Sequence, residues 1–91
     1  MNISSAAPPR VLLVDDHDLF RTGLRNLLEE QGVQVVGECG NGTDALRLVR
    51  EAAPDVVVMD LNMPGISGVE ATRQISMIAP LTRVLVLTTS D

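Results

Sequence analysis

Apolar residues are concentrated in four short runs that are rich in β-branched side chains. The runs predict strands over residues 10–15, 33–39, 55–60 and 82–88. Val56–Met59 and Val84–Leu87 are continuously apolar, which is typical of strands buried on both faces of a parallel sheet. The run at 33–39 alternates less cleanly, and we expect it to form a shorter edge strand.

Between these runs, apolar residues recur at the spacing of an α-helix. The first helix is expected to have Asp18 as its cap and to end at Gly32. The second is expected from a Thr43 cap to about Ala53, and the third follows Ser67, which forms a capping box with Glu70. The predicted inward residues of the three helices are Phe20, Leu24, Leu27 and Leu28; Leu46, Val49 and Ala53; and Ala71, Ile75 and Ile78. This alternation of strands and helices predicts an α/β fold with a parallel sheet and helices on both faces.

The composition indicates one small domain. With 45% hydrophobic residues in 91, the chain is too apolar to be disordered, and we expect a flexible tail over residues 1–9 and a domain over 10–91. Neither a membrane-length apolar segment nor a signal sequence is evident. Cys39 is the only cysteine, which excludes an internal disulfide and favours the cytoplasm. A net charge of -5 argues against nucleic-acid binding by this segment.

Carboxylates follow two of the predicted strands. Asp15 and Asp16 end the first strand, and Asp60 ends the third. One such aspartate is explained equally well as a turn residue. If the two strands are adjacent and parallel, however, all three acids converge at one edge and repel one another. Hard oxygen ligands with room for water and phosphate favour Mg²⁺ at this edge.

A carboxylate beside Mg²⁺ is able to accept a phosphoryl group as an acyl phosphate. Thr88, at the end of the fourth strand, could hold the transferred oxygens, although a threonine there is equally well explained by its β-propensity. We interpret His17 as a loop residue next to the acids rather than a ligand.

Several motifs together resemble the receiver domain of bacterial two-component response regulators: Val14–His17, Met59–Gly65, Gly68 and Val84–Thr88. The run Asp16–Leu24 further resembles the LuxR/FixJ-like subfamily, which carries a C-terminal helix-turn-helix. The resemblance covers the chain from Arg10 onward. It implies a flavodoxin-like, doubly wound sheet of order 2-1-3-4-5.

The resemblance also implies roles for individual residues. Asp60 would be the phospho-acceptor for a sensor histidine kinase. Mg²⁺ would be held by Asp15, Asp16, Asp60 and the backbone carbonyl of Asn62, and Thr88 would be the switch hydroxyl. The full-length protein would bind DNA through an output domain.

Receivers of this family also contain a fourth helix, a fifth strand with an essential lysine and a switch aromatic residue, and a fifth helix. We expect this chain to lack them and to end after the fourth strand, with order 2-1-3-4. The chain contains seven arginines and no lysine. Arg10 and Arg83 would lie at the opposite strand ends, roughly 15 Å from the acids at about 3.3 Å per residue. Arg21 on the first helix is placed where it could reach over the site, although nothing requires it to do so. We therefore expect poor phosphorylation of Asp60.

Other functions compete with this interpretation. An aspartyl-phosphate phosphohydrolase usually has a second acid two residues after its nucleophile, where this chain has Asn62, so we do not expect an enzyme. A nucleotide-binding domain would have glycines after the first strand, where this chain has Asp15 to Asp18. An inactive fragment that only self-associates is compatible with a receiver. The fourth strand would be an edge without a protective Lys or Pro, so we expect a homodimer or strand exchange through it.

Overall fold

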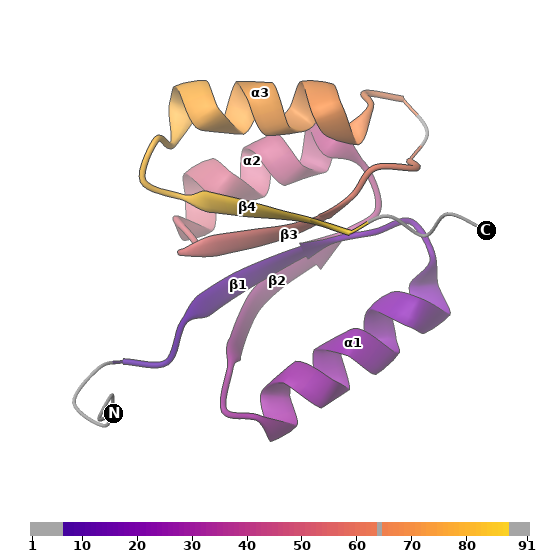
Figure 1. Ribbon diagram of the computed structural model, residues 1–91, viewed down its shortest axis with the longest axis vertical. Coiled ribbons are helices and arrows are strands. Elements are labelled where there is room, and N and C mark those ends of the chain that lie inside the picture. Colours follow the sequence, from indigo (N-terminus) through magenta and orange to yellow (C-terminus); the bar gives the residue numbers. More distant parts are fainter. Residues whose placement is uncertain (1–6, 64, 88–91) are drawn as a thin grey trace.

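The computed structural model describes residues 7–63 and 65–87 of the chain. Within these residues, four strands alternate with three helices (Figure 1). The elements are β1 (Arg10–Val14), α1 (Asp18–Glu30), β2 (Gln34–Cys39), α2 (Gly42–Ala52), β3 (Val56–Asp60), α3 (Gly68–Ile78) and β4 (Arg83–Leu87). The described strand boundaries agree with the predicted ones to within one residue. Thr88 and the first six residues of the predicted tail lie outside the described residues.

All four strands are parallel and form one sheet of order β2-β1-β3-β4, which confirms the predicted architecture. The register places Leu13 beside Val58 and Val58 beside Leu85. The pairing of β1 with β2 shifts by one residue, so that Val36 is passed over in the register. This bulge accounts for the irregular alternation of the β2 sequence, because an inserted residue interrupts the two-residue period.

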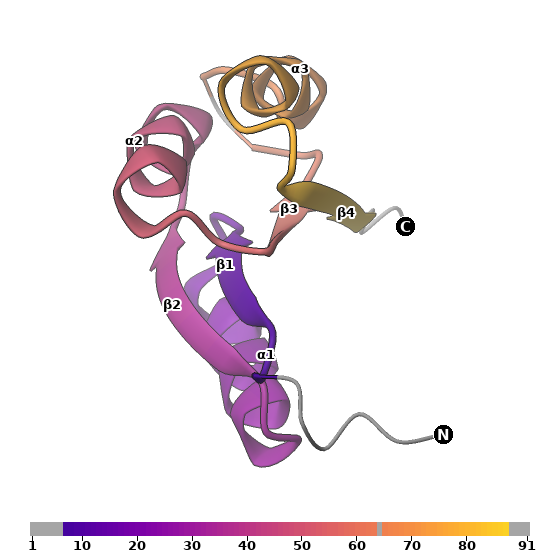
Figure 2. The same ribbon diagram turned by 90° about the vertical axis from the view of Figure 1, so that its left-hand side faces the viewer.

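Helices α2 and α3 cover one face of the sheet, and α1 covers the other (Figure 2). The larger apolar cluster lies under α2 and α3, where Leu12, Val57 and Met59 of the sheet are fully buried. Of the predicted inward residues, Leu46, Val49, Ala71 and Ile75 join this cluster. Ala53 and Ile78 were wrongly predicted, because each lies at the end of its helix and is exposed. Ala53 is the α2 C-cap, with a left-handed φ of 46°.

The face under α1 has a smaller cluster, in which Val11, Leu13 and Val35 are buried. Leu24 and Leu28 pack against it as predicted, but Phe20 and Leu27 are exposed, contrary to the prediction. Helix α1 contacts β1 and β2. On the helix surface, Phe20 and Leu27 lie on the flank opposite the arginines that pair with β2. Helical periodicity identifies the apolar side of α1, but burial also requires a surface for that side to contact.

Two of the three predicted helix caps are corrected. The α1 N-cap position is His17, which makes no side-chain cap bond, and Asp18 is the first helical residue. Asn41, rather than Thr43, caps α2 by accepting a hydrogen bond of 2.8 Å from the Asp44 backbone N–H. Both residue types cap well, and Asn41 has the extended backbone that the position requires. Ser67 caps α3 as predicted, accepting from the Glu70 N–H at 3.1 Å.

No helix in the described part of the chain is both long and apolar enough to cross a membrane.

Candidate functional site

Three aspartates converge where β1 and β3 end. Asp60 is the last residue of β3 and is 1% exposed, and Asp15 directly follows β1 and is 4% exposed. Asp16 is more open to solvent, with 31% of its side chain exposed. Asp15, Asp16, Asp60 and His17 each direct one potential ligand atom into a region where these atoms lie within 4.8 Å of one another. The sheet register produces this cluster, since parallel neighbours bring their carboxyl ends to one edge.

Backbone hydrogen bonds orient the two buried carboxylates. Asp15 Oδ1 accepts from the His17 N–H at 2.7 Å, and Asp60 Oδ1 accepts from the Asn62 N–H at 2.9 Å. The other carboxylate oxygen of Asp60, Oδ2, is buried and has no hydrogen-bond partner among the described residues. A buried polar atom without a partner is costly, so this oxygen is suited to a ligand that the chain itself does not supply.

The imidazole of His17 lies against the acids more closely than sequence reasoning anticipated. Its Nδ1 is 3.1 Å from Asp15 Oδ1, 3.2 Å from Asp16 Oδ1 and 3.6 Å from Asp60 Oδ2. The last distance is too long for a hydrogen bond, so Asp60 Oδ2 accepts no hydrogen bond from the described residues, and it lies within ion-pair distance of His17 but pairs with it only when the imidazole is protonated. The hydrogen bond to Asp15, followed by the charge of Asp16, raises the pKa of His17. Its position between two acids in sequence was the only signal of this contact.

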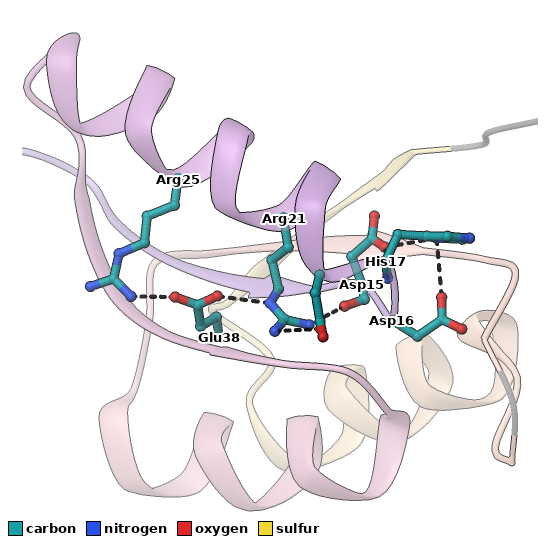
Figure 3. Close-up of polar contacts among 7 residues, drawn as sticks. Asp15, Asp16, His17, Arg21, Arg25 and Glu38 are labelled. Carbon is teal, nitrogen blue, oxygen red and sulfur yellow. Dashed lines mark hydrogen bonds and ion pairs between the residues drawn. The ribbon is translucent and has the colours of Figure 1, made fainter.

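Arg21 reaches the site from α1. Its guanidinium Nη1 donates to the backbone carbonyl oxygen of Asp15 at 2.5 Å, and its Nε donates to Glu38 Oε1 on β2 at 2.7 Å (Figure 3). The arginines at the amino ends of the strands lie elsewhere, as predicted. Arg10 donates to the Ala53 carbonyl, and Arg83 pairs with Val56 in the register. Arg21, which the sequence placed within possible reach of the site without requiring a contact, is thus brought by the fold to the backbone of Asp15.

The first turn of α3 packs directly against the backbone of Asp60. A Cβ atom added to Gly68 would lie 2.7 Å from the Asp60 carbonyl oxygen and 2.7 Å from Leu61 Cα. Such distances are not tolerated, so glycine is required for α3 to begin at this point. The contact helps to define where the β3 carboxyl end, and with it Asp60, is held.

Of the two remaining predicted site residues, Asn62 is described and Thr88 is not. Asn62 is brought to the site by the hydrogen bond from its N–H to Asp60. Thr88 lies outside the described residues, but its neighbour Leu87 pairs with Asp60 in the β3–β4 register. The Leu61 N–H also donates to the Leu87 carbonyl at 3.4 Å. Strand β4 therefore ends beside the acid cluster.

The donor set fits a hard divalent cation. Most of the converging atoms are carboxylate oxygens, the ligands that Mg²⁺ and Ca²⁺ prefer. Uncompensated carboxylates at this distance repel one another, and the unpartnered Asp60 Oδ2 lies in their midst. A carboxylate in this position, beside a cation, is also able to act as a nucleophile toward phosphorus.

Comparison with known proteins places the chain in a family. The sequence matches the family model of the response regulator receiver domain over residues 11–91. It is 51% identical to the response regulator GacA of Pseudomonas aeruginosa over 83 residues, which cover 90% of this chain and 39% of GacA. It is also 51% identical to the response regulator UvrY of Escherichia coli over 79 residues, which cover 86% of this chain and 36% of UvrY.

The fold agrees with this assignment. A crystal structure of a two-component response regulator of the LuxR family from Aurantimonas sp. SI85-9A1 superposes with a TM-score of 0.87 at 45% identity, covering 92% of this chain and 61% of that chain. The chain spans less than half the length of the curated relatives named above. On the strength of sequence, topology and structural similarity, the chain belongs to the response regulator receiver domain family.

Proposed function

We propose that this chain is the phospho-accepting module of a two-component response regulator and that Asp60 receives the phosphoryl group. The observation that carries the proposal is the buried Asp60 carboxylate at the end of β3, with one oxygen unpartnered inside an acid cluster. Such a group combines a nucleophilic oxygen with a site that attracts a divalent cation. The proposed donor is a phosphohistidine on a sensor kinase, and the proposed output is a DNA-binding domain outside these 91 residues.

The metal in this proposal is Mg²⁺, held by Asp15, Asp16, Asp60 and the backbone carbonyl of Asn62. When bound, Mg²⁺ would offset the charge of the acids and of the incoming phosphoryl group. The chain's own contribution is orientation. The N–H groups of His17 and Asn62 each hold one carboxylate oxygen, which leaves the second oxygen of Asp60 free.

In the proposed transfer, a carboxylate oxygen of Asp60 attacks phosphorus as the P–N bond of phosphohistidine breaks. A P–O bond forms and the product is an acyl phosphate. The electron pair of the broken P–N bond stays on the histidine nitrogen, and the histidine leaves as a neutral imidazole because its other ring nitrogen carries a proton in the phosphohistidine. The burial of Asp60 limits the access of water to the acyl phosphate. Thr88, which follows the end of β4, is proposed to hold the transferred oxygens.

Charge limits how fully this chain is expected to be modified. Asp15 and Asp16 carry two negative charges, the phosphoryl group adds about two more, and Mg²⁺ returns two positive charges. A surplus of about two negative charges remains at the site. The sequence contains no lysine, and the Arg21 guanidinium is engaged with Asp15, Asp18 and Glu38. We therefore expect low occupancy of the phosphorylated state.

We propose that the chain is not an enzyme. A phosphohydrolase passing through the same intermediate would need a general acid near the nucleophile, and the position two residues after Asp60 is Asn62. Self-association through β4 is a second proposal, which is compatible with the first. It is favoured by exposed Leu85 and Val86 on a strand that pairs, among the described residues, with β3 alone.

Chemical trapping tests the acceptor assignment. The chain is incubated with acetyl phosphate with and without Mg²⁺, reduced with borohydride to convert an acyl phosphate to homoserine, and mapped by peptide mass spectrometry. We expect a low yield of homoserine at position 60 only, dependent on Mg²⁺ and lost in Asp60→Asn. Asp44→Asn, which alters a half-exposed acid on α2, is the control and should leave the yield unchanged. Homoserine elsewhere, or none at position 60, would overturn the assignment, and stoichiometric modification would contradict the charge argument.

A further inference from the structure

Arg21 is bonded to three separate parts of the molecule. Its guanidinium donates to the Asp15 carbonyl in the β1–α1 loop and to Glu38 on β2. It also pairs with Asp18 in the first turn of α1, with a distance of 3.0 Å between Nη2 and Oδ1. Only 16% of the side chain is exposed. The planar guanidinium suits this role, because its donors point in several fixed directions at once.

The Arg21 contact completes the fixation of the Asp15 backbone. On one side, the Asp15 N–H donates to the Cys39 carbonyl on β2 at 3.0 Å. On the other side, the Asp15 carbonyl accepts from Arg21. The peptide that leads into Asp16 is therefore held at a defined position relative to β2. Since both acids leave this short segment, its position decides where their carboxylates meet Asp60.

We propose that Arg21 is a positioning residue for the cation site, acting through its hydrogen bond to the Asp15 carbonyl. The inference rests on the proposed function, since it concerns the Mg²⁺ affinity of the same acids. Arg21 does not touch the ligand atoms of Asp15 or Asp60 in this arrangement. Its effect passes through the backbone, like that of groups that orient metal ligands from behind.

Charge and position predict opposite effects of removing Arg21. A guanidinium near the acids repels a cation, so loss of its charge alone would strengthen Mg²⁺ binding. Loss of the tie to Asp15 would instead release the loop and weaken binding. Arg21→Lys separates the two effects, because it keeps the charge but cannot reproduce the planar set of donors. If position dominates, Arg21→Lys and Arg21→Gln both bind Mg²⁺ more weakly.

Arg25 provides a matched control on the same helix. Like Arg21, it pairs with Glu38, and it also pairs with Glu29. Its described polar contacts do not include the β1–α1 loop (Figure 3). Arg25→Gln therefore removes one positive charge and one link between α1 and β2, but it leaves the Asp15 carbonyl bonded.

The test is the Mg²⁺ dissociation constant of the 91-residue chain, obtained from amide chemical shifts, for wild type, Arg21→Lys, Arg21→Gln and Arg25→Gln. Both Arg21 variants should bind about tenfold more weakly, as is usual for groups that orient ligands. Arg25→Gln should stay within about twofold of wild type, because its contacts with Glu38 and Glu29 do not hold the Asp15 backbone. In the metal-free protein, the amide chemical shifts of Asp16 and His17 should differ from those of wild type in Arg21→Lys and should be unchanged in Arg25→Gln.

Urea unfolding of each variant confirms that it is folded. If Arg21→Gln does not fold, the comparison rests on Arg21→Lys. Equal or tighter binding by the Arg21 variants would overturn the positioning role. Equal weakening by Arg25→Gln would also overturn it, because the effect would then arise from general loosening of α1. Absence of Mg²⁺ binding by wild type is a different result, and it would contradict the proposed function itself.

Discussion

The two faces of the sheet are covered in different ways. Under α2 and α3, side chains from the sheet and both helices form one large buried cluster that includes Leu12, Met59 and Ile75. Under α1, the buried cluster consists of Val11, Leu13 and Val35, all from the sheet. No residue of α1, which is described over its whole length, is fully buried.

Polar contacts compensate on the α1 face. Glu38 of β2 accepts from both Arg21 and Arg25, which join α1 to the edge of the sheet. The acids of the candidate site lie at the carboxyl edge, between the two faces. Asp60 is supported from the α3 side by Gly68, whereas Asp15 is supported from the α1 side by Arg21. The two halves of one site therefore depend on different kinds of interaction, one on close packing and one on a hydrogen bond from a side chain.

Truncation of a core residue on each face should show the difference most strongly. Ile75→Ala removes a fully buried side chain under α3 and should lower the free energy of unfolding by about 3 kcal/mol. Leu28→Ala removes a half-buried side chain of α1 and should cost about 1 kcal/mol. Urea denaturation measures both values. Equal losses would show that the α1 face is as tightly packed as the other.

Glycine substitutions provide a sharper comparison of the two faces. Gly68→Ala places a Cβ against the backbone of Asp60 and Leu61, and should destabilise the protein by about 2 kcal/mol while shifting the amide signals of both residues. Gly23→Ala is the matched change in the middle of α1, where nothing lies within 4 Å of the added atom. It should stabilise the helix by up to about 1 kcal/mol. A loss of stability in Gly23→Ala would contradict the open environment that the structure gives this position of α1.

The exposed edge should promote association. Leu85 and Val86 are 57% and 40% exposed on β4, and an unprotected edge strand favours pairing with a second chain. Sedimentation of wild type should show association that rises with protein concentration, and Val86→Lys should weaken it by about tenfold, equivalent to about 1.4 kcal/mol. A stable, fully folded monomer at high wild-type concentration would contradict the proposal.

The ion pairs of the α1 face should give a small, pH-dependent contribution. Hydrogen bonds from Arg21 and then Arg25 lower the pKa of Glu38 below its ordinary value. A lowered pKa means that the contribution is complete at neutral pH and is lost as the pH falls below about 4.3 toward the pKa in the folded protein. Glu38→Gln should therefore cost about 1 kcal/mol at pH 7 and less in acid. Urea denaturation at pH 7 and at pH 3.5 compares the two, and a cost that is independent of pH would exclude the ion pairs as its source.

The strands, their parallel direction and the acids at their ends were predictable because they depend on short-range patterns, whereas the strand order 2-1-3-4 was implied by the resemblance to receiver domains. An apolar run that stops at an aspartate places that aspartate at a strand end, and parallel pairing brings Asp15 and Asp60 to one edge. The predicted inward face of α1 was half wrong, since Phe20 and Leu27 need a neighbouring surface that periodicity does not report. The Asn41 cap was missed because Thr43, two residues away, is also a good cap.

The side-chain contacts of the site were the least predictable part. The positions of Arg21 and Glu38 are 17 residues apart in the chain, and they meet because β2 lies beside β1 and under α1. The direction of the His17 ring likewise depends on the β1–α1 loop, which nothing in the local sequence determines. Such contacts depend on how the elements pack in space and on side-chain rotamers, whereas the residues at the strand ends follow directly from the local sequence.

Paramagnetic mapping with Mn²⁺ examines the cation site directly. Mn²⁺ accepts the same oxygen ligands as Mg²⁺ and broadens the amide signals of nearby residues. At substoichiometric Mn²⁺, the amides of residues 15–17 and 60–62 should broaden first, excess Mg²⁺ should restore them, and Asp60→Asn should respond much less. Broadening centred on other acids, or an identical response in wild type and Asp60→Asn, would contradict a cation site built around Asp60.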